Sequence, residues 1–141
     1  MGVSKASAQW EGGLKGGKGS MKPGHVAEVP FSFGSRFEGQ PASNPEEMIG
    51  AALAGCFSMA LTASLEKAGL KPGSVRTSAE VKLEAKDGGF AITGIDLTTE
   101  ASVAGVDDAK FQEIAAETKK GCPVSKALAA TPISLKATLK G

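Results

Sequence analysis

The sequence predicts a fold of mixed helices and strands whose core is completed by a second subunit. A helix with clear start and stop signals carries no charged residue between Met48 and Leu65. Glycine-punctuated segments precede it, and segments of alternating apolar residues follow it. Ala and Gly supply 41 of the 141 residues, and the larger apolar residues number only 36, so core-building volume is thin. We therefore expect one domain over residues 1–141 that folds as an obligate homodimer.

The segment before the helix reads as short strands and a loop. Residues 5–11 and 15–21 are predicted to pair as a hairpin across two glycines. Apolar residues between 26 and 33 predict a further short strand. Residues 34–43 are rich in Gly, Ser and Pro, and we expect a loop there.

The helix itself has the strongest local signals in the chain. Asn44 is a good N-cap, Pro45 suits the first helical position, and Glu47 completes a capping-box pattern. The helix should run to about Ala68, where Gly69 ends it. We reject a membrane span because small and hydroxyl residues fill much of the stretch and its N-terminal flank is acidic. A helix that is apolar on all sides must instead be buried on all sides.

The second half alternates strands and helices. Alternating apolar residues and a turn at 87–89 predict a hairpin with a bulge at Gly94, and Asp107 or Asp108 caps the next helix. Cys122 and Pro123 open a short third helix. The predicted ranges are strands 74–85, 90–103 and 133–139 and helices 108–120 and 123–129.

Composition excludes several classes of function. The net charge is +1 and no basic run exceeds two residues, which argues against binding to nucleic acid or to a membrane surface. The N-terminus has no apolar signal segment, so we expect a cytoplasmic protein. Two cysteines 66 positions apart form no metal-binding spacing, and His25 is the only histidine, so we expect neither a metal nor another cofactor.

Two motifs favour ordinary structural roles. Residues 12–20 nearly match a phosphate-binding loop, but Gly19 stands where the magnesium-binding hydroxyl should be and no helix follows. A flexible hairpin is the better interpretation. His25 lies in a polar loop, where a surface histidine is more common than a ligand or a base.

The two cysteines have different surroundings. Cys56 lies in the middle of the apolar helix, where an inert buried thiol is the simplest interpretation and reactivity requires a cation from elsewhere. Cys122 stands at the N-cap of a helix, where partial positive charge favours thiolate, although it can also be a chance small capping residue.

Arg36 and Glu46 are the polar candidates near the helix start. Glu47 is explained by capping, which leaves Glu46 free for another role. Ten residues separate Glu46 from Cys56, about 15 Å along one helix, so they cannot meet within it. Two antiparallel copies crossing at Ala51, among small residues, would bring Glu46 of one subunit to Cys56 of the other.

These residues together resemble the OsmC (osmotically inducible protein C) family, within the OsmC/Ohr group of thiol peroxidases. The resemblance spans nearly the whole chain and is carried by Trp10–Glu11–Gly12, Arg36–Phe37–Glu38–Gly39, residues 44–61 (NPEEMIGAALAGCFSMAL) and residues 121–125 (GCPVS). It implies an α+β fold with two intertwined subunits, in which antiparallel β-sheets wrap two long central helices. Active sites would lie at the subunit interface.

The resemblance also implies roles for four residues. Cys56 would be the peroxidatic cysteine and Cys122 the resolving cysteine, with Arg36 and Glu46 as the pair that holds and activates the thiolate. The expected activity is reduction of organic hydroperoxides, and of hydrogen peroxide to some degree. An external dithiol, with lipoylated proteins as the suggested donor, would restore both thiols. Leu53 replaces a His or Tyr common in relatives, which leaves the substrate preference open.

Two other functions need fewer features. A non-catalytic dimeric module would use the interface pocket only to bind a hydrophobic ligand. A dithiol redox sensor would signal through a disulfide between Cys56 and Cys122, with rapid oxidation but slow turnover.

Overall fold

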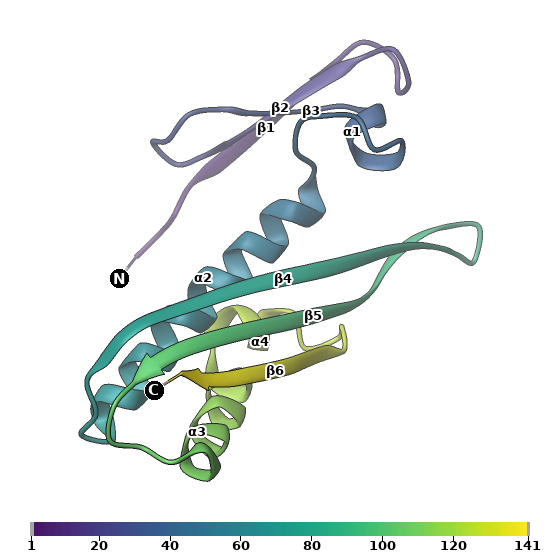
Figure 1. Ribbon diagram of the computed structural model, residues 1–141. Helices are drawn as coiled ribbons and strands as arrows, with labels where there is room; N and C mark the ends of the chain where they lie inside the picture. Colours follow the sequence, from purple (N-terminus) through teal and green to yellow (C-terminus); the bar gives the residue numbers. More distant parts are fainter. Residues whose placement is uncertain (1, 141) are drawn as a thin grey trace. The chain divides into compact units, whose positions relative to one another are not determined.

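The computed structural model describes residues 2–140, and the chain divides between Met48 and Ile49 into two compact units (Figure 1). The first unit holds an antiparallel sheet in the order β1-β2-β3, built from β1 (Ala6–Glu11), β2 (Lys18–Pro23) and β3 (Val29–Phe31). Glu11 pairs with Lys18 at the closed end of the β1–β2 hairpin. The predicted hairpin is confirmed, but its second strand begins at Lys18 instead of residue 15, and its turn spans residues 12–17.

The predicted loop at 34–43 is wrong at its start. A short helix, α1 (Phe33–Phe37), forms there. Ser32 caps it, because its hydroxyl accepts the Ser35 N–H at 3.0 Å while the Ser35 hydroxyl accepts the Ser32 N–H at 2.8 Å. This reciprocal pair is a capping box built from two serines. The capping pattern was present in the sequence, but the segment is too short to show helical periodicity.

The central helix, α2 (Pro45–Lys67), confirms its predicted boundaries. The Asn44 side-chain oxygen accepts the Glu47 N–H at 2.8 Å. Gly69 ends the helix with φ +84°, and the Leu70 N–H bonds to the Leu65 carbonyl at 3.0 Å. Glycine adopts this left-handed conformation without steric cost.

The second unit is built on one mixed sheet, in the order β4-β5-β6. The hairpin of β4 (Pro72–Lys86) and β5 (Gly89–Val103) turns at Asp87 and Gly88, both with positive φ, and the register shifts by one residue beside Gly94, as predicted. The all-antiparallel expectation is wrong for β6 (Ile133–Lys140), which pairs parallel to β5. Parallel neighbours require a crossover connection, and α3 (Asp108–Gly121) and α4 (Pro123–Ala127) supply it.

Helix α2 buries one face against this sheet. Leu53, Phe57, Leu61 and Leu65, each four residues after the last, are fully buried. They join the buried face of β5 and the α3 side chains Phe111 and Ala115 in one hydrophobic core. Helices and sheet thus form two layers around that core.

The opposite face of α2 stays uncovered within a single chain. Ala52, Gly55 and Ala63 are exposed, and Met59 is 79% exposed. By length and composition α2 could cross a membrane, but its other face belongs to the core just described. Gly50 faces the sheet, where an added Cβ would lie 3.2 Å from Val81. Its small size is therefore explained by packing on β4, without a helix crossing.

Candidate functional site: two cysteines and an arginine–glutamate pair

The two cysteines lie in direct contact. Their Sγ atoms are 2.8 Å apart, with the Cys122 thiol donating toward Cys56, and both cysteines are free thiols. Cys122 is fully buried, whereas Cys56 is half-buried. The fold has therefore brought together two sulfurs that lie 66 positions apart in sequence.

Cys122 is held at a junction between two helices. Its N–H closes the last turn of α3 on the Thr118 carbonyl at 2.9 Å, and its carbonyl accepts the Lys126 N–H of α4 at 3.0 Å. Pro123 occupies the first position of α4 and needs no hydrogen-bond acceptor there. These backbone bonds fix the thiol against α2.

A chain of hydroxyls fixes α2 on the sheet beside Cys56. Ser58 donates to Thr77 at 2.7 Å, Thr77 and Thr99 share a bond of 2.9 Å, and Thr99 also bonds the Arg76 carbonyl. Thr99 is fully buried. Because buried hydroxyls need partners, this chain specifies the rotation of the helix and hence the direction of Cys56.

The surroundings shift the pKa values of the two thiols in opposite directions. Burial raises the pKa of Cys56, and the neighbouring Cys122 raises it further, against the lowering effect of the Val124 N–H. Burial opposes ionisation of Cys122 too, but the contact with Cys56, the Ser125 N–H and hydroxyl and the Val124 N–H together lower the pKa of Cys122. Within this unit, the thiol predicted to react with peroxide is the more weakly acidic of the two.

Removing Cys122 should therefore make Cys56 more acidic. In Cys122→Ala both effects of Cys122 that raise the Cys56 pKa disappear, so the thiolate fraction at neutral pH increases. We expect the rate of Cys56 alkylation by iodoacetamide, followed by mass spectrometry of its peptide, to reach half-maximum at lower pH than in the wild type. A midpoint unchanged or shifted upward would contradict this.

Arg36 and Glu46 form a bidentate ion pair in the first unit. The Arg36 Nε and Nη2 atoms donate to Glu46 Oε1 at 2.8 and 2.6 Å, and Nε also reaches Oε2 at 3.3 Å. Glu46 is only 6% exposed, while the Arg36 side chain is 36% exposed. The pair uses one edge of the guanidinium, so the Nη1 donors are outside it.

Helix α1, which the sequence analysis did not predict, positions Arg36. The buried Ser35 hydroxyl donates to the Ser43 carbonyl at 2.7 Å, and the Asn44 amide donates to the Ser35 carbonyl at 3.3 Å. These bonds tie α1 to the residues that cap α2, so Arg36 and Glu46 meet. The four predicted site residues thus form two contacting pairs, one in each unit.

Sequence reasoning missed an aromatic hollow beside Arg36. A cavity of about 180 Å³ is lined by Trp10, Leu14, Phe31, Ser32, Phe33, Arg36 and Phe37. The Arg36 guanidinium lies 5.4 Å from the Phe37 ring centroid, and the Phe33 and Phe37 rings are 4.9 Å apart. The available signal was the concentration of four of the seven aromatic residues before residue 38.

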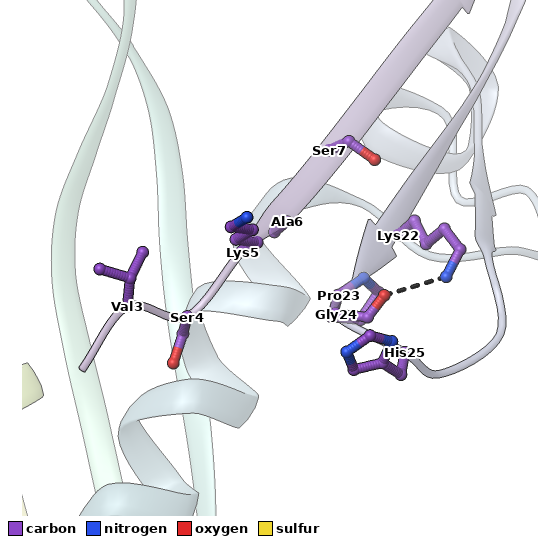
Figure 2. Close-up of a pocket in the computed structure, with 9 residues that line it drawn as sticks. All are labelled: Val3, Ser4, Lys5, Ala6, Ser7, Lys22, Pro23, Gly24 and His25. Atoms are coloured by element: carbon purple, nitrogen blue, oxygen red, sulfur yellow. Dashed lines mark hydrogen bonds between the residues drawn. The ribbon is translucent and has the colours of Figure 1, made fainter. Parts of the chain in front are cut away.

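A larger hollow in the same unit contains none of the four predicted site residues. Figure 2 shows the Lys22 ammonium directed at the Gly24 carbonyl, with His25 beside it and Val3 and Ser4 across from them. Lys22 is held by two carbonyls, those of Gly24 and Val26. This cavity, of about 870 Å³, contains neither cysteine and neither member of the ion pair.

The near match to a phosphate-binding loop forms the β1–β2 turn. The Gly17 N–H bonds to the Gly13 carbonyl at 2.9 Å, and a Cβ on Gly17 would lie 2.4 Å from backbone oxygens, so glycine is required there by packing. Among residues 2–140 no three His, Cys, Asp or Glu side chains gather as metal ligands.

An α+β fold that brings two free thiols together, with a separate arginine–glutamate pair, defines a dithiol redox protein. Residues 37–137 match the OsmC-like protein family, and the chain belongs to that family. Peroxiredoxin OsmC of Escherichia coli K12 is 49% identical over 128 residues, which cover 89% of this chain and 90% of that protein.

Solved structures agree on the fold. The organic hydroperoxide resistance protein OhrB of Bacillus subtilis is 26% identical with a TM-score of 0.67, covering 96% of this chain and 98% of its own. An organic hydroperoxide resistance protein of Elizabethkingia anophelis is 25% identical with a TM-score of 0.72, covering 100% of this chain and 97% of its own. These likenesses confirm the α+β fold and the family resemblance.

Proposed function

We propose that this protein is a thiol peroxidase that reduces organic hydroperoxides with the Cys56–Cys122 pair. The observation that carries the proposal is the 2.8 Å contact between the two free thiols. A peroxidase of this type needs a second thiol within bond-forming reach of the first, because the oxidised sulfur must be captured before further oxidation. The family and the names of the relatives support the same activity.

The proposed reaction has two half-reactions. The Cys56 thiolate attacks one oxygen of the O–O bond, the alkoxide leaves and takes a proton, and Cys56 becomes a sulfenic acid. Cys122 then attacks that sulfur, releasing water and forming the disulfide. An external dithiol reduces the disulfide by exchange, and lipoylated proteins are the donor we propose.

Arg36 is the cation that we propose for the Cys56 thiolate. The guanidinium stays charged at any working pH, so it offsets the burial that raises the Cys56 pKa. Its Nη1 donors, outside the pair with Glu46, would stabilise charge developing on the peroxide oxygens. Glu46 orients the guanidinium, and its burial keeps that orientation rigid.

The aromatic hollow favours an organic substrate. A cavity of roughly 150 Å³ can hold benzene, so the 180 Å³ beside Arg36 is enough for one aromatic or alkyl group. Hydrogen peroxide has no such group and gains nothing from the aromatic walls. We therefore expect kcat/KM for cumene hydroperoxide to exceed that for hydrogen peroxide, at least tenfold, as a buried alkyl group contributes about 1.5–3 kcal/mol.

The test of the function is peroxide consumption with dithiothreitol as the reductant. Multiple turnovers with cumene hydroperoxide, faster than with hydrogen peroxide, support the proposal. Rapid formation of the disulfide with only slow turnover would instead favour a redox sensor. Absence of any thiol oxidation would leave a non-catalytic ligand-binding module.

We further propose that the working unit is a cytoplasmic homodimer in which the ion pair of one subunit serves the partner subunit's Cys56. The exposed apolar face of α2, with Ala52, Gly55 and Met59, supports burial by a second copy. Glu46 and Cys56 are also ten positions apart on one continuous helix, which prevents their meeting within that helix.

Mixing two inactive variants tests this arrangement. Arg36→Ala keeps Cys56 and Cys56→Ser keeps Arg36, so a mixed dimer has one complete site only if each site combines the two subunits. After joint unfolding and refolding at equal amounts, we expect about a quarter of wild-type activity, because half of the dimers are mixed and each has one complete site of two. Activity no greater than the sum of the separate variants would contradict the shared site.

A further inference from the structure

One buried hydroxyl beside the cysteine pair has no partner. Ser125, at the third position of α4, is 7% exposed, and its Oγ has no hydrogen-bond partner among the described residues. Most buried hydroxyls in proteins are hydrogen-bonded, because an unmade bond costs stability. An exception next to a reacting sulfur therefore needs an explanation.

The surroundings of Cys122 give that explanation. In the dithiol state the Cys122 thiol donates to Cys56 and makes no capping hydrogen bond to α4. The groups that favour its negative charge are Cys56 from α2 and, from α4, the Val124 N–H and the Ser125 N–H and hydroxyl. Among the titratable groups in the described part of the chain, only Cys56 contacts the Cys122 Sγ and affects its pKa.

Burial decides which sulfur of a disulfide a reductant can reach. Cys122 is fully buried and Cys56 is half-buried, so an external thiolate would attack the Cys56 Sγ. The S–S bond then breaks and its electron pair goes to the Cys122 Sγ, which leaves as a buried thiolate. A leaving thiol of lower pKa leaves faster, and a buried anion needs hydrogen-bond donors.

We propose that the Ser125 hydroxyl is a leaving-group donor that bonds to the Cys122 thiolate when the disulfide is reduced. This inference rests on the proposed Cys56–Cys122 disulfide. In the full step, the first thiolate of a dithiol forms a mixed disulfide with Cys56 and Cys122 leaves. The second thiolate then displaces Cys56 and closes a cyclic disulfide, and both cysteine thiolates regain protons from water. Ser125 thus acts on the regeneration of the enzyme.

The experiment separates the two half-reactions. The disulfide is first formed with diamide, which does not depend on peroxidase activity, and its reduction by dithiothreitol is then followed under pseudo-first-order conditions. Ser125→Ala should slow this reduction about tenfold, the effect of one lost hydrogen bond to a charged group. Oxidation of the reduced protein by cumene hydroperoxide should stay near the wild-type rate.

Two controls distinguish a donor from a packing residue. Ser125→Thr retains a hydroxyl and should recover the reduction rate. Ser64→Ala, which removes a partly buried hydroxyl bonded to Thr118, should leave that rate unchanged. In a Cys56→Ser background, the thiolate absorbance of Cys122 near 240 nm should appear at higher pH when Ser125 is replaced by Ala.

The outcomes are separable from those of the proposed function. Unchanged reduction and an unchanged Cys122 titration in Ser125→Ala would overturn the inference, as would equal slowing of oxidation and reduction. If peroxide fails to oxidise the wild type while diamide succeeds, the peroxidase proposal fails, and the reduction and titration results still decide the role of Ser125.

Discussion

Cys56→Ser should reduce cumene hydroperoxide consumption by a factor on the order of 1,000 or more, because the nucleophile that attacks the O–O bond is lost and the remaining thiol, Cys122, is fully buried. Serine keeps nearly the same size, so the core around Phe57 should stay intact. The measurement is initial peroxide loss with excess dithiothreitol. Thermal unfolding within a few degrees of wild type would show that the loss is chemical.

Cys122→Ser is the matched variant for this result. It should consume its first equivalent of peroxide at least as fast as the wild type, because Cys56 remains and loses the neighbouring thiol that raises its pKa. It should then stall or turn over slowly, because the sulfenic acid has no thiol partner. If Cys56→Ser retains wild-type consumption, or if Cys122→Ser loses the first equivalent, the assigned roles of the two cysteines are wrong.

Arg36→Ala should affect both stability and rate. The change leaves the Glu46 carboxylate buried without its cation, which should lower the free energy of unfolding by about 2 kcal/mol. The loss is smaller than for a fully buried ion pair because the Arg36 side chain is partly exposed to solvent. It also removes the proposed donor to the peroxide oxygens, so the rate of Cys56 oxidation should fall about a hundredfold.

The double variant Arg36→Ala/Glu46→Gln separates these two effects. A neutral amide removes the stranded charge, so denaturant unfolding should show most of the lost stability restored. The oxidation rate should stay low, since the guanidinium is still absent. A folded Arg36→Ala protein that oxidises within threefold of the wild-type rate would remove the activating role of Arg36.

Local signals predicted the elements well. Asn44, Pro45 and Gly69 act within one turn of a helix end, so their effect can be inferred without knowing the fold. Helix α1 escaped prediction because a five-residue helix shows no periodicity, and only the pairing of Ser32 with Ser35 marks it. The direction of β6 depends on the α3–α4 crossover, which is a property of topology.

The site was harder to predict from the sequence than the fold. The chain brings Cys122 to Cys56 through a junction of two helices packed on a third, and no local pattern encodes that distance. Local polarity alone favoured an inert Cys56, and its raised pKa agrees with that setting. The pairing of Arg36 with Glu46 was implied only by family resemblance, and the serine-capped helix α1 explains it physically.

The most direct test of the Cys56–Cys122 mechanism is mass spectrometry of the reduced protein after one equivalent of cumene hydroperoxide, with peptide mapping under non-reducing conditions. We predict loss of two hydrogen masses, loss of both titratable thiols, and a single disulfide between the peptides that contain Cys56 and Cys122 of one chain. Unreacted thiols, or a stable Cys56 oxidation product with Cys122 still free, would contradict the mechanism.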